Sequence, residues 1–167
     1  MEEHGIKLIE CTNKSKNIWV VRWGIKKIEN EQFPYYDYQE ERFNHIPTEQ
    51  EIKDVINNYY NKVTDQRILT GFKWKDISVW LSVENQFNYK ATYDLAVQTS
   101  GKNLPVTFKF GTDEKPMYHT FNTVDELSEF YISAISYVQK CYTDGWKQKD
   151  SFDYTKYFEV VNKATYY

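Results

Sequence analysis

The sequence predicts an α+β fold: an antiparallel sheet built from hairpins, helices packed on one face, and an N-terminal strand-rich segment. Two observations lead to this prediction. From residue 66 onward, alternation typical of strands takes turns with the three- and four-residue spacing typical of helices. The resulting order is hairpin, helix, hairpin, long helix, and two hairpins can share one sheet with both helices on one face. Residues 1–46, in contrast, have the pattern of strands.

The N-terminal segment contains consecutive strand candidates. In the second of them, Trp19, Val21 and Trp23 alternate with other side chains, so one face is more apolar and aromatic. The last one is expected to be an irregular edge strand that ends at Pro47. The candidates are IKLIEC (6–11), NIWVVRWG (17–24), IKKIEN (25–30) and QFPYYDYQEERFNHIP (32–47).

A capping box opens the first predicted helix. Thr48 and Glu51 have the spacing at which each side chain can bond the other residue's backbone amide, and Pro47 comes just before them. An apolar stripe with helical spacing comes next, so we expect this helix to cover a sheet; its members are Ile52, Val55, Ile56, Tyr59 and Tyr60.

The period changes to two at Arg67, which predicts a hairpin. Its two runs are RILTGFKWKD (67–76) and ISVWLS (77–82), joined by a tight turn at Lys75-Asp76. Ser82 has the position of an N-cap for a helix over 83–98, and Ser100-Gly101 ends that helix. The helix is expected to bury some of Phe87, Ala91, Leu95 and Ala96.

A second hairpin and a long helix complete the pattern. Strands at 104–110 and 117–121 flank a loop over 111–116, and Thr123 with Glu126 forms a second capping box. Gly145 is expected to weaken or end the long helix, and Trp146 to pin the segment after it. The aromatic tail, 151–167, is expected to dock on this chain or on a neighbour. The apolar stripe of the long helix is Leu127, Phe130, Tyr131, Ala134, Ile135, Val138 and Cys141.

Two domains are predicted from this order: a strand-rich segment over 1–46 and an α+β domain over 47–167. The chain of 167 residues has a net charge of −3 and no basic stripe, so nucleic-acid binding is not expected. No apolar run has the length of a membrane span, and the polar N-terminus does not resemble a secretory signal. The lone cysteines, Cys11 and Cys141, indicate reduced thiols in a protein made in cytoplasm.

No catalytic, cofactor-binding or metal-binding residue is predicted, so the chain is not expected to be an enzyme. The three histidines (His4, His45 and His119) lack zinc-ligand spacing, and no glycine-rich phosphate loop or nucleophile elbow is present. A carboxylate pair could cleave glycosides. The carboxylates near the first hairpin nevertheless suit turn and helix positions, and they are Asp76, Glu84 and Asp94.

Dense aromatic and amide side chains lie around the first hairpin and the start of the next helix. They are Trp74, Trp80, Asn85, Gln86 and Tyr89. Aromatic rings beside amides can bind sugars, and they can equally hold a hairpin–helix junction together by packing and by bonding exposed backbone groups. The 15 tyrosines have a similar double interpretation, as a partner surface or as half-buried sheet positions.

Several short motifs recur in an order that resembles a known family. They are ILTGFKW (68–74), LPVTFK (104–109), TVDEL (123–127) and GWKQK (145–149). Over about residues 66–155 the chain resembles a domain of unknown function found in tail-fibre and tail-associated proteins of tailed phages, including gut Bacteroides-type phages and prophages.

The resemblance implies a bacteriophage virion structural protein, associated with the tail or tail fibre as an adaptor, decoration or fibre-attachment subunit. It would be made in the host cytoplasm and located in the virion, and would bind other tail, collar or fibre subunits within an oligomeric assembly. Two alternatives stay open: a carbohydrate-binding module that contacts a host glycan during attachment, and a tail-assembly factor absent from the mature virion. The family offers no catalytic residues to transfer.

Overall fold

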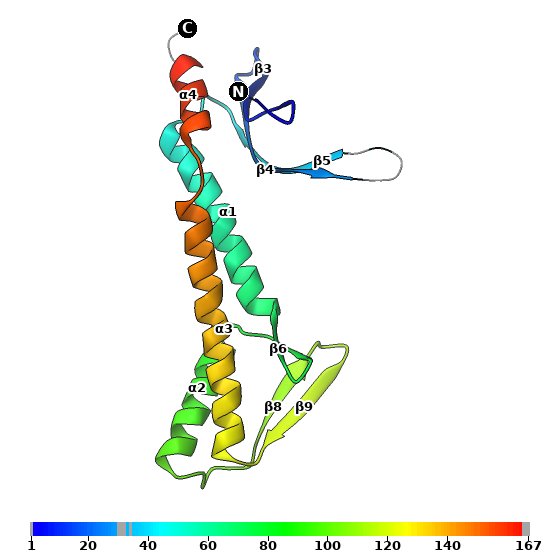
Figure 1. Cartoon of the computed structure of the whole chain (residues 1–167), viewed down its shortest axis with the longest axis vertical. Helices are drawn as coiled ribbons and strands as arrows, with labels where there is room; N and C mark the ends of the chain where they lie inside the picture. Colours follow the sequence, from blue (N-terminus) through cyan, green and yellow to red (C-terminus); the bar gives the residue numbers. More distant parts are fainter. Residues whose placement is uncertain (1, 30–32, 34, 165–167) are drawn as a thin grey trace. The chain divides into compact units, whose positions relative to one another are not determined.

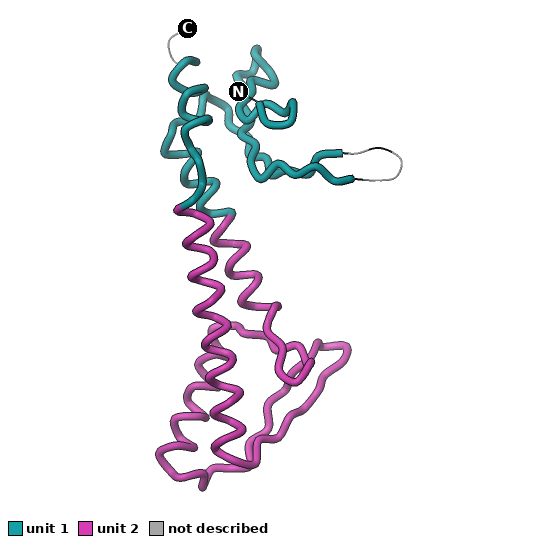
Figure 2. Tube along the Cα trace, in the orientation of Figure 1, with its two compact units in different colours: residues 1–59, 151–167 teal, residues 60–150 magenta. Residues whose placement is uncertain are grey.

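A computed structural model describes residues 2–29, 33 and 35–164, and its helices and small antiparallel sheets confirm the α+β class (Figure 1). The chain divides into two compact units (Figure 2). Unit 1 combines residues 1–59 with 151–167, and unit 2 consists of residues 60–150. The predicted strand-rich segment, 1–46, therefore shares its unit with the start of the first helix and with the C-terminal tail.

Unit 1 is built around a three-stranded antiparallel sheet with the order β3-β4-β5. β5 lies at the edge, as predicted, while residues 25–28 continue β4 instead of forming a strand of their own. Gly24 has a φ of +64°, and the β4–β5 register shifts between Trp23 and Lys26, so a bulge joins the two predicted strands into one. The predictions for residues 30–32 and 34 fall outside the described residues. The strands are β1 (Glu2–Glu3), β2 (Ile6–Lys7), β3 (Ile9–Asn13), β4 (Ile18–Ile28) and β5 (Tyr35–Phe43).

Helices α1 (Glu49–Thr70) and α4 (Thr155–Ala164) supply the helical part of unit 1, α1 with its residues up to 59. The capping box of α1 is confirmed: Thr48 N donates to Glu51 Oε2 at 2.8 Å, and Glu51 N donates to Thr48 Oγ1 at 3.2 Å. The tail docks on this chain, because the buried Tyr157 of α4 donates its hydroxyl to the Arg22 carbonyl at 2.9 Å.

In unit 2, α1 continues to Thr70, beyond the predicted change of period at Arg67. The last turn has helical partners: Thr70 Oγ1 donates to the Gln66 carbonyl at 2.9 Å, and Gly71 N donates to the Arg67 carbonyl at 2.9 Å. The hydroxyl of Tyr137 also donates to the Arg67 carbonyl, at 2.9 Å. The prediction of a strand over 67–70 was wrong because these tertiary and capping bonds extend the helix.

The two predicted hairpins are present, as β6 (Phe72–Trp74) with β7 (Ile77–Val79) and as β8 (Val106–Gly111) with β9 (Pro116–Phe121). The first turn is formed by Lys75 and Asp76, both in the left-handed region with φ of 48° and 64°. A tight hairpin turn thus forms here without glycine. Each hairpin makes its own two-stranded sheet, and β7 lies beside β8 without a shared ladder.

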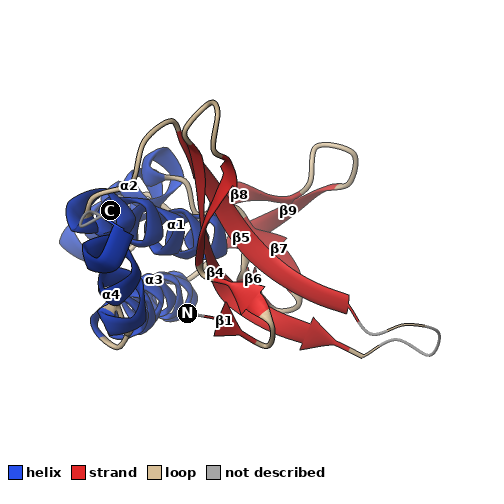
Figure 3. Ribbon diagram, turned by 90° about the horizontal axis from the view of Figure 1, so that it is seen from above, coloured by secondary structure: helices blue, strands red, loops and turns tan. Residues whose placement is uncertain are grey.

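Helices α2 (Val83–Gln98) and α3 (Val124–Asp150) both lie on one side of the β8–β9 hairpin (Figure 3). Ser82 caps α2 as predicted, accepting from Asn85 N at 3.2 Å. Glu126 N donates to Thr123 Oγ1 at 3.2 Å, which confirms half of the second capping box. Gly145 was expected to weaken or end α3; it does not end the helix, which runs unbroken to Asp150.

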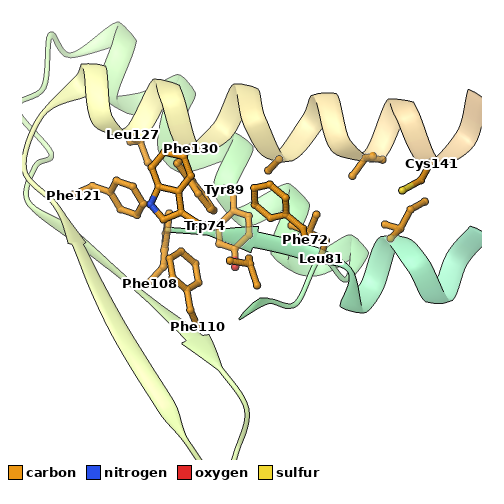
Figure 4. Packing of buried hydrophobic residues seen from close by; sticks show 14 of the residues in the cluster. Phe72, Trp74, Leu81, Tyr89, Phe108, Phe110, Phe121, Leu127, Phe130 and Cys141 are labelled. Carbon is orange, nitrogen blue, oxygen red and sulfur yellow. The ribbon is translucent and has the colours of Figure 1, made fainter. Parts of the chain in front are cut away.

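The core of unit 2 is aromatic and centres on Phe130 of α3 (Figure 4). Phe130 contacts the rings of Phe108, Phe110 and Phe121, with centroid distances of 5.1–6.0 Å. Five members of the predicted α3 stripe are buried: Leu127, Phe130, Ala134, Val138 and Cys141. On α2, where some of Phe87, Ala91, Leu95 and Ala96 were expected to be buried, Ala96 is buried and the other three are exposed.

Candidate functional site

Two of the five predicted site residues are buried in the core of unit 2. Trp74 and Tyr89 are only 6% and 4% exposed. The Trp74 ring meets Phe130 edge to face at 5.4 Å, and the Tyr89 ring lies 4.7 Å from Phe108 (Figure 4). Burial raises the pKa of Tyr89 to about 12. The suggestion that these two rings stack on a sugar is therefore wrong, because neither offers a free face to a ligand.

The two amide side chains bond the backbone at the start of α2. Asn85 Nδ2 donates to the Trp80 carbonyl and Gln86 Nε2 to the Leu81 carbonyl, both at 2.8 Å. These carbonyls lie between β7 and α2, where no ladder or helix bond would otherwise satisfy them. The interpretation of this stretch as a hairpin–helix junction accounts for Asn85 and Gln86.

Trp80 is the predicted ring that lies at the surface, since the residue is 49% exposed. Together with Asn85 it borders a hollow of about 570 Å³. The other walls come from β8 and the β8–β9 loop: Lys109, Phe110, Gly111, Thr112, Asp113 and Glu114. Lys109 Nζ lies 3.1 Å from Asp113 Oδ1, so the hollow presents an ion pair, an indole and an amide. Such a mixture can hydrogen-bond a polar ligand while covering its apolar side.

The outer face of α2 is a second candidate, which the sequence interpretation missed. Val83 is 83% exposed, Phe87 73% and Leu95 48%, and they recur every four residues with Ala91 between them. We call these four residues the outer α2 face. The opposite side of the helix buries Tyr89 and Ala96, so α2 is apolar on both sides. Apolar residues on two opposite sides of one helix were the available signal, because a helix with one buried side needs only one apolar stripe.

Glu126 joins three elements of unit 2 through its carboxylate. Its Oε1 lies 2.6 Å from Lys75 Nζ in the β6–β7 turn and 3.0 Å from His119 Nε2 in β9. The hydrogen bond from Lys75, followed by that from His119, lowers the pKa of Glu126 below its ordinary value. A carboxylate held ionised in this way stabilises a junction and is poorly suited to donating a proton in catalysis.

The carboxylates considered for glycoside cleavage have separate structural surroundings. Asp94 pairs with Lys90 along α2, and Asp76 lies in the β6–β7 turn. Over residues 2–29, 33 and 35–164, no group of three or more His, Cys, Asp or Glu side chains is arranged to hold a metal ion. Among the same residues, no helix has both the length and the apolar character needed to cross a bilayer.

The fold and these surfaces define an α+β protein with an aromatic core in unit 2 and apolar side chains on the outside of α2. Comparison with known proteins adds no relative: no family model, no curated protein sequence and no solved structure matches the chain.

Proposed function

We propose that the chain is a non-enzymatic structural protein that works by binding other proteins, as a tail or tail-fibre associated subunit of a bacteriophage virion. The resemblance over residues 66–155 supports the phage setting. The 15 tyrosines and the outer α2 face support a role in protein–protein contact. In this role the protein is made in the host cytoplasm and binds other tail, collar or fibre subunits.

The outer α2 face is the observation that supports this proposal most. Val83 and Phe87 project large apolar side chains into solvent on a helix whose opposite side is already packed against the core. Removing a Val or Phe side chain from water stabilises a complex by roughly 1.5–3 kcal/mol per residue. Contiguous apolar exposure of this kind marks interaction surfaces on folded proteins.

Mass spectrometry of purified virions tests the setting. Detection of the chain in stoichiometric amount is expected for a tail subunit, while its presence in infected cells but absence from particles would favour the assembly-factor alternative. Presence in neither phage particles nor assembly intermediates would contradict the phage proposal as a whole.

Substitution of Phe87 tests the surface. Phe87→Glu places a charge on the outer α2 face without touching the core, so the protein should fold normally and lose its partner in co-purification from infected cells. Lys73→Glu is a matched control on the exposed side of β6. Equal partner recovery with wild type and Phe87→Glu would contradict the assignment of this face.

A second candidate function is host-glycan binding at the hollow beside Trp80. The observation in its favour is that Trp80 and Asn85 border the same cavity as the polar β8–β9 loop. Trp80→Ala should then reduce phage adsorption and binding on a glycan array. Unchanged adsorption and a blank array would remove this candidate while leaving the protein-binding proposal intact.

A further inference from the structure

A second hollow lies between α1 and α3, inside unit 2, where the two helices pack closely. Gly145 of α3 faces Thr64 of α1, and a Cβ on Gly145 would collide with the Thr64 hydroxyl. Around this contact, side chains from both helices line a space of about 270 Å³. The lining residues are Asn61, Thr64 and Asp65 of α1 with Tyr142, Gly145, Trp146 and Lys149 of α3.

Two aromatic rings form one wall of this hollow. Tyr142 and Trp146, one turn apart on α3, have ring centroids 6.2 Å apart and planes inclined by only 20°. They are 42% and 56% exposed, so both residues remain partly accessible to solvent. The exposed face of an aromatic ring is flat and apolar, and the face of a pyranose ring that bears its C–H groups is flat and apolar as well.

The other lining side chains offer hydrogen-bonding groups. Lys149 Nζ donates to Asn61 Oδ1 at 2.8 Å, which links the two helices and fixes the amide. Thr64 Oγ1 donates to the Tyr60 carbonyl at 2.8 Å. Asp65 adds a carboxylate, so the lining contains one negative and one positive side chain. Balanced charge favours a neutral ligand over a phosphorylated or acidic one.

We propose that this hollow binds a neutral saccharide, with its sugar ring on Tyr142 and Trp146 and its hydroxyls on Asn61, Asp65 and Lys149. The volume lies just below the usual range of small-molecule sites, which suits one or two sugar rings. This inference does not depend on the proposed function, since the lining excludes Trp80 and the outer α2 face. It places a sugar site where the sequence interpretation expected only a helix end.

Saturation-transfer NMR on the full-length protein tests the proposal directly. The probes are soluble neutral sugars that present different hydroxyl orientations: maltotriose, cellobiose, galactobiose, mannobiose and N,N′-diacetylchitobiose. At least one should receive saturation from the protein at millimolar concentration. No transfer to any of the five would overturn the proposal.

Variants locate the site. Trp146→Ala should weaken binding of the positive probe roughly tenfold, because one aromatic stacking contact has about that effect. Trp146→Phe should retain part of the affinity, and Trp80→Ala, the matched exposed-tryptophan control, should retain all of it. Loss of binding in Trp80→Ala with full binding in Trp146→Ala would overturn the proposal in favour of the other hollow. Because Trp146 is exposed, an unchanged melting curve is expected for each variant.

Discussion

Gly145 lies where α3 packs closely against α1, and its missing side chain has a local cost and a tertiary benefit. A glycine inside a helix is about 1 kcal/mol less favourable than alanine. Here an added Cβ would collide with Thr64 Oγ1 and lie 3.3 Å from Thr64 Cγ2, so the close approach depends on glycine.

Gly145→Ala should therefore destabilise the protein in spite of its better helix propensity. Overpacking costs about 1–3 kcal/mol, of which the better helix propensity of alanine offsets at most about 1 kcal/mol. The double variant Thr64→Ala with Gly145→Ala removes both close atoms and should recover most of the loss in urea unfolding. A Gly145→Ala protein more stable than wild type would contradict this account of the helix crossing.

Glu126 gives the molecule a predictable acid response. The pKa of Glu126 is lowered in the folded protein. Its contribution to the free energy of unfolding is therefore fully present above the ordinary pKa of 4.5, and it is lost as the pH falls through the lower pKa of the folded state. Glu126→Gln should lower the free energy of unfolding at neutral pH by up to about 1 kcal/mol. It should also flatten the decline of stability below about pH 4.5.

The control for this charge is Glu129→Gln, which removes an exposed glutamate from the same helix. Chemical denaturation of the three proteins at pH values on both sides of the transition measures the effect. A decline equally steep in Glu126→Gln and wild type would show that the contacts with Lys75 and His119 contribute nothing to stability.

At the level of elements, the sequence predicted the ends of a helix correctly wherever residues close to that end in the sequence determine it. The Thr48–Glu51 capping box, the Ser82 cap and the residues after Thr99 were read correctly because side-chain and turn chemistry acts within a few residues. The end of α1 was misplaced because Tyr137, distant in sequence, bonds the Arg67 carbonyl. A pattern of alternating residues does not contain that information.

The candidate site was less predictable than the fold. Trp74, Trp80 and Tyr89 belong to the same aromatic-rich stretch, and only packing against Phe130 and Phe108 separates the buried pair from Trp80. Tyr142 and Trp146 left a weaker signal: two aromatic residues one helical turn apart and off the buried stripe of α3. Which aromatic side chains stay exposed depends on which other segments of the chain pack against them. The three-dimensional structure was therefore needed to tell the exposed rings from the buried ones.

The two sides of α2 differ in what they contribute to folding, although both are apolar. Tyr89→Ala should cost about 3–5 kcal/mol, as for other buried aromatic residues, because Tyr89 contacts three phenylalanine rings. Phe87→Ala, two residues earlier, should change the free energy of unfolding by less than about 0.5 kcal/mol. Urea denaturation of both variants checks the difference, and similar losses for the two would mean that the outer α2 face is covered within the monomer.

On the scale of the whole molecule, the chain forms two compact units that each bury their own apolar residues. Unit 1 buries Val161 of α4 with side chains such as Ile52 and Ile56, and unit 2 buries Val138 of α3 in the Phe130 cluster. Local unfolding is expected to involve one unit at a time, because a cooperative unit unfolds when the contacts inside it are lost. The order of elements along the chain hides this division, since unit 1 is assembled from both ends of the sequence.

A matched pair of substitutions tests the independence of the two cores. Val161 and Val138 are 6% and 5% exposed, so truncation of either to alanine removes the same atoms from a similar degree of burial. Each variant should lose about 1–3 kcal/mol of local stability. Val161→Ala should speed amide hydrogen exchange in β3, β4 and α4, while Val138→Ala should speed it in α2, β8 and β9. Mass spectrometry of the exchanged peptides measures both, and equal acceleration throughout the chain in either variant would mean that the two units open as one.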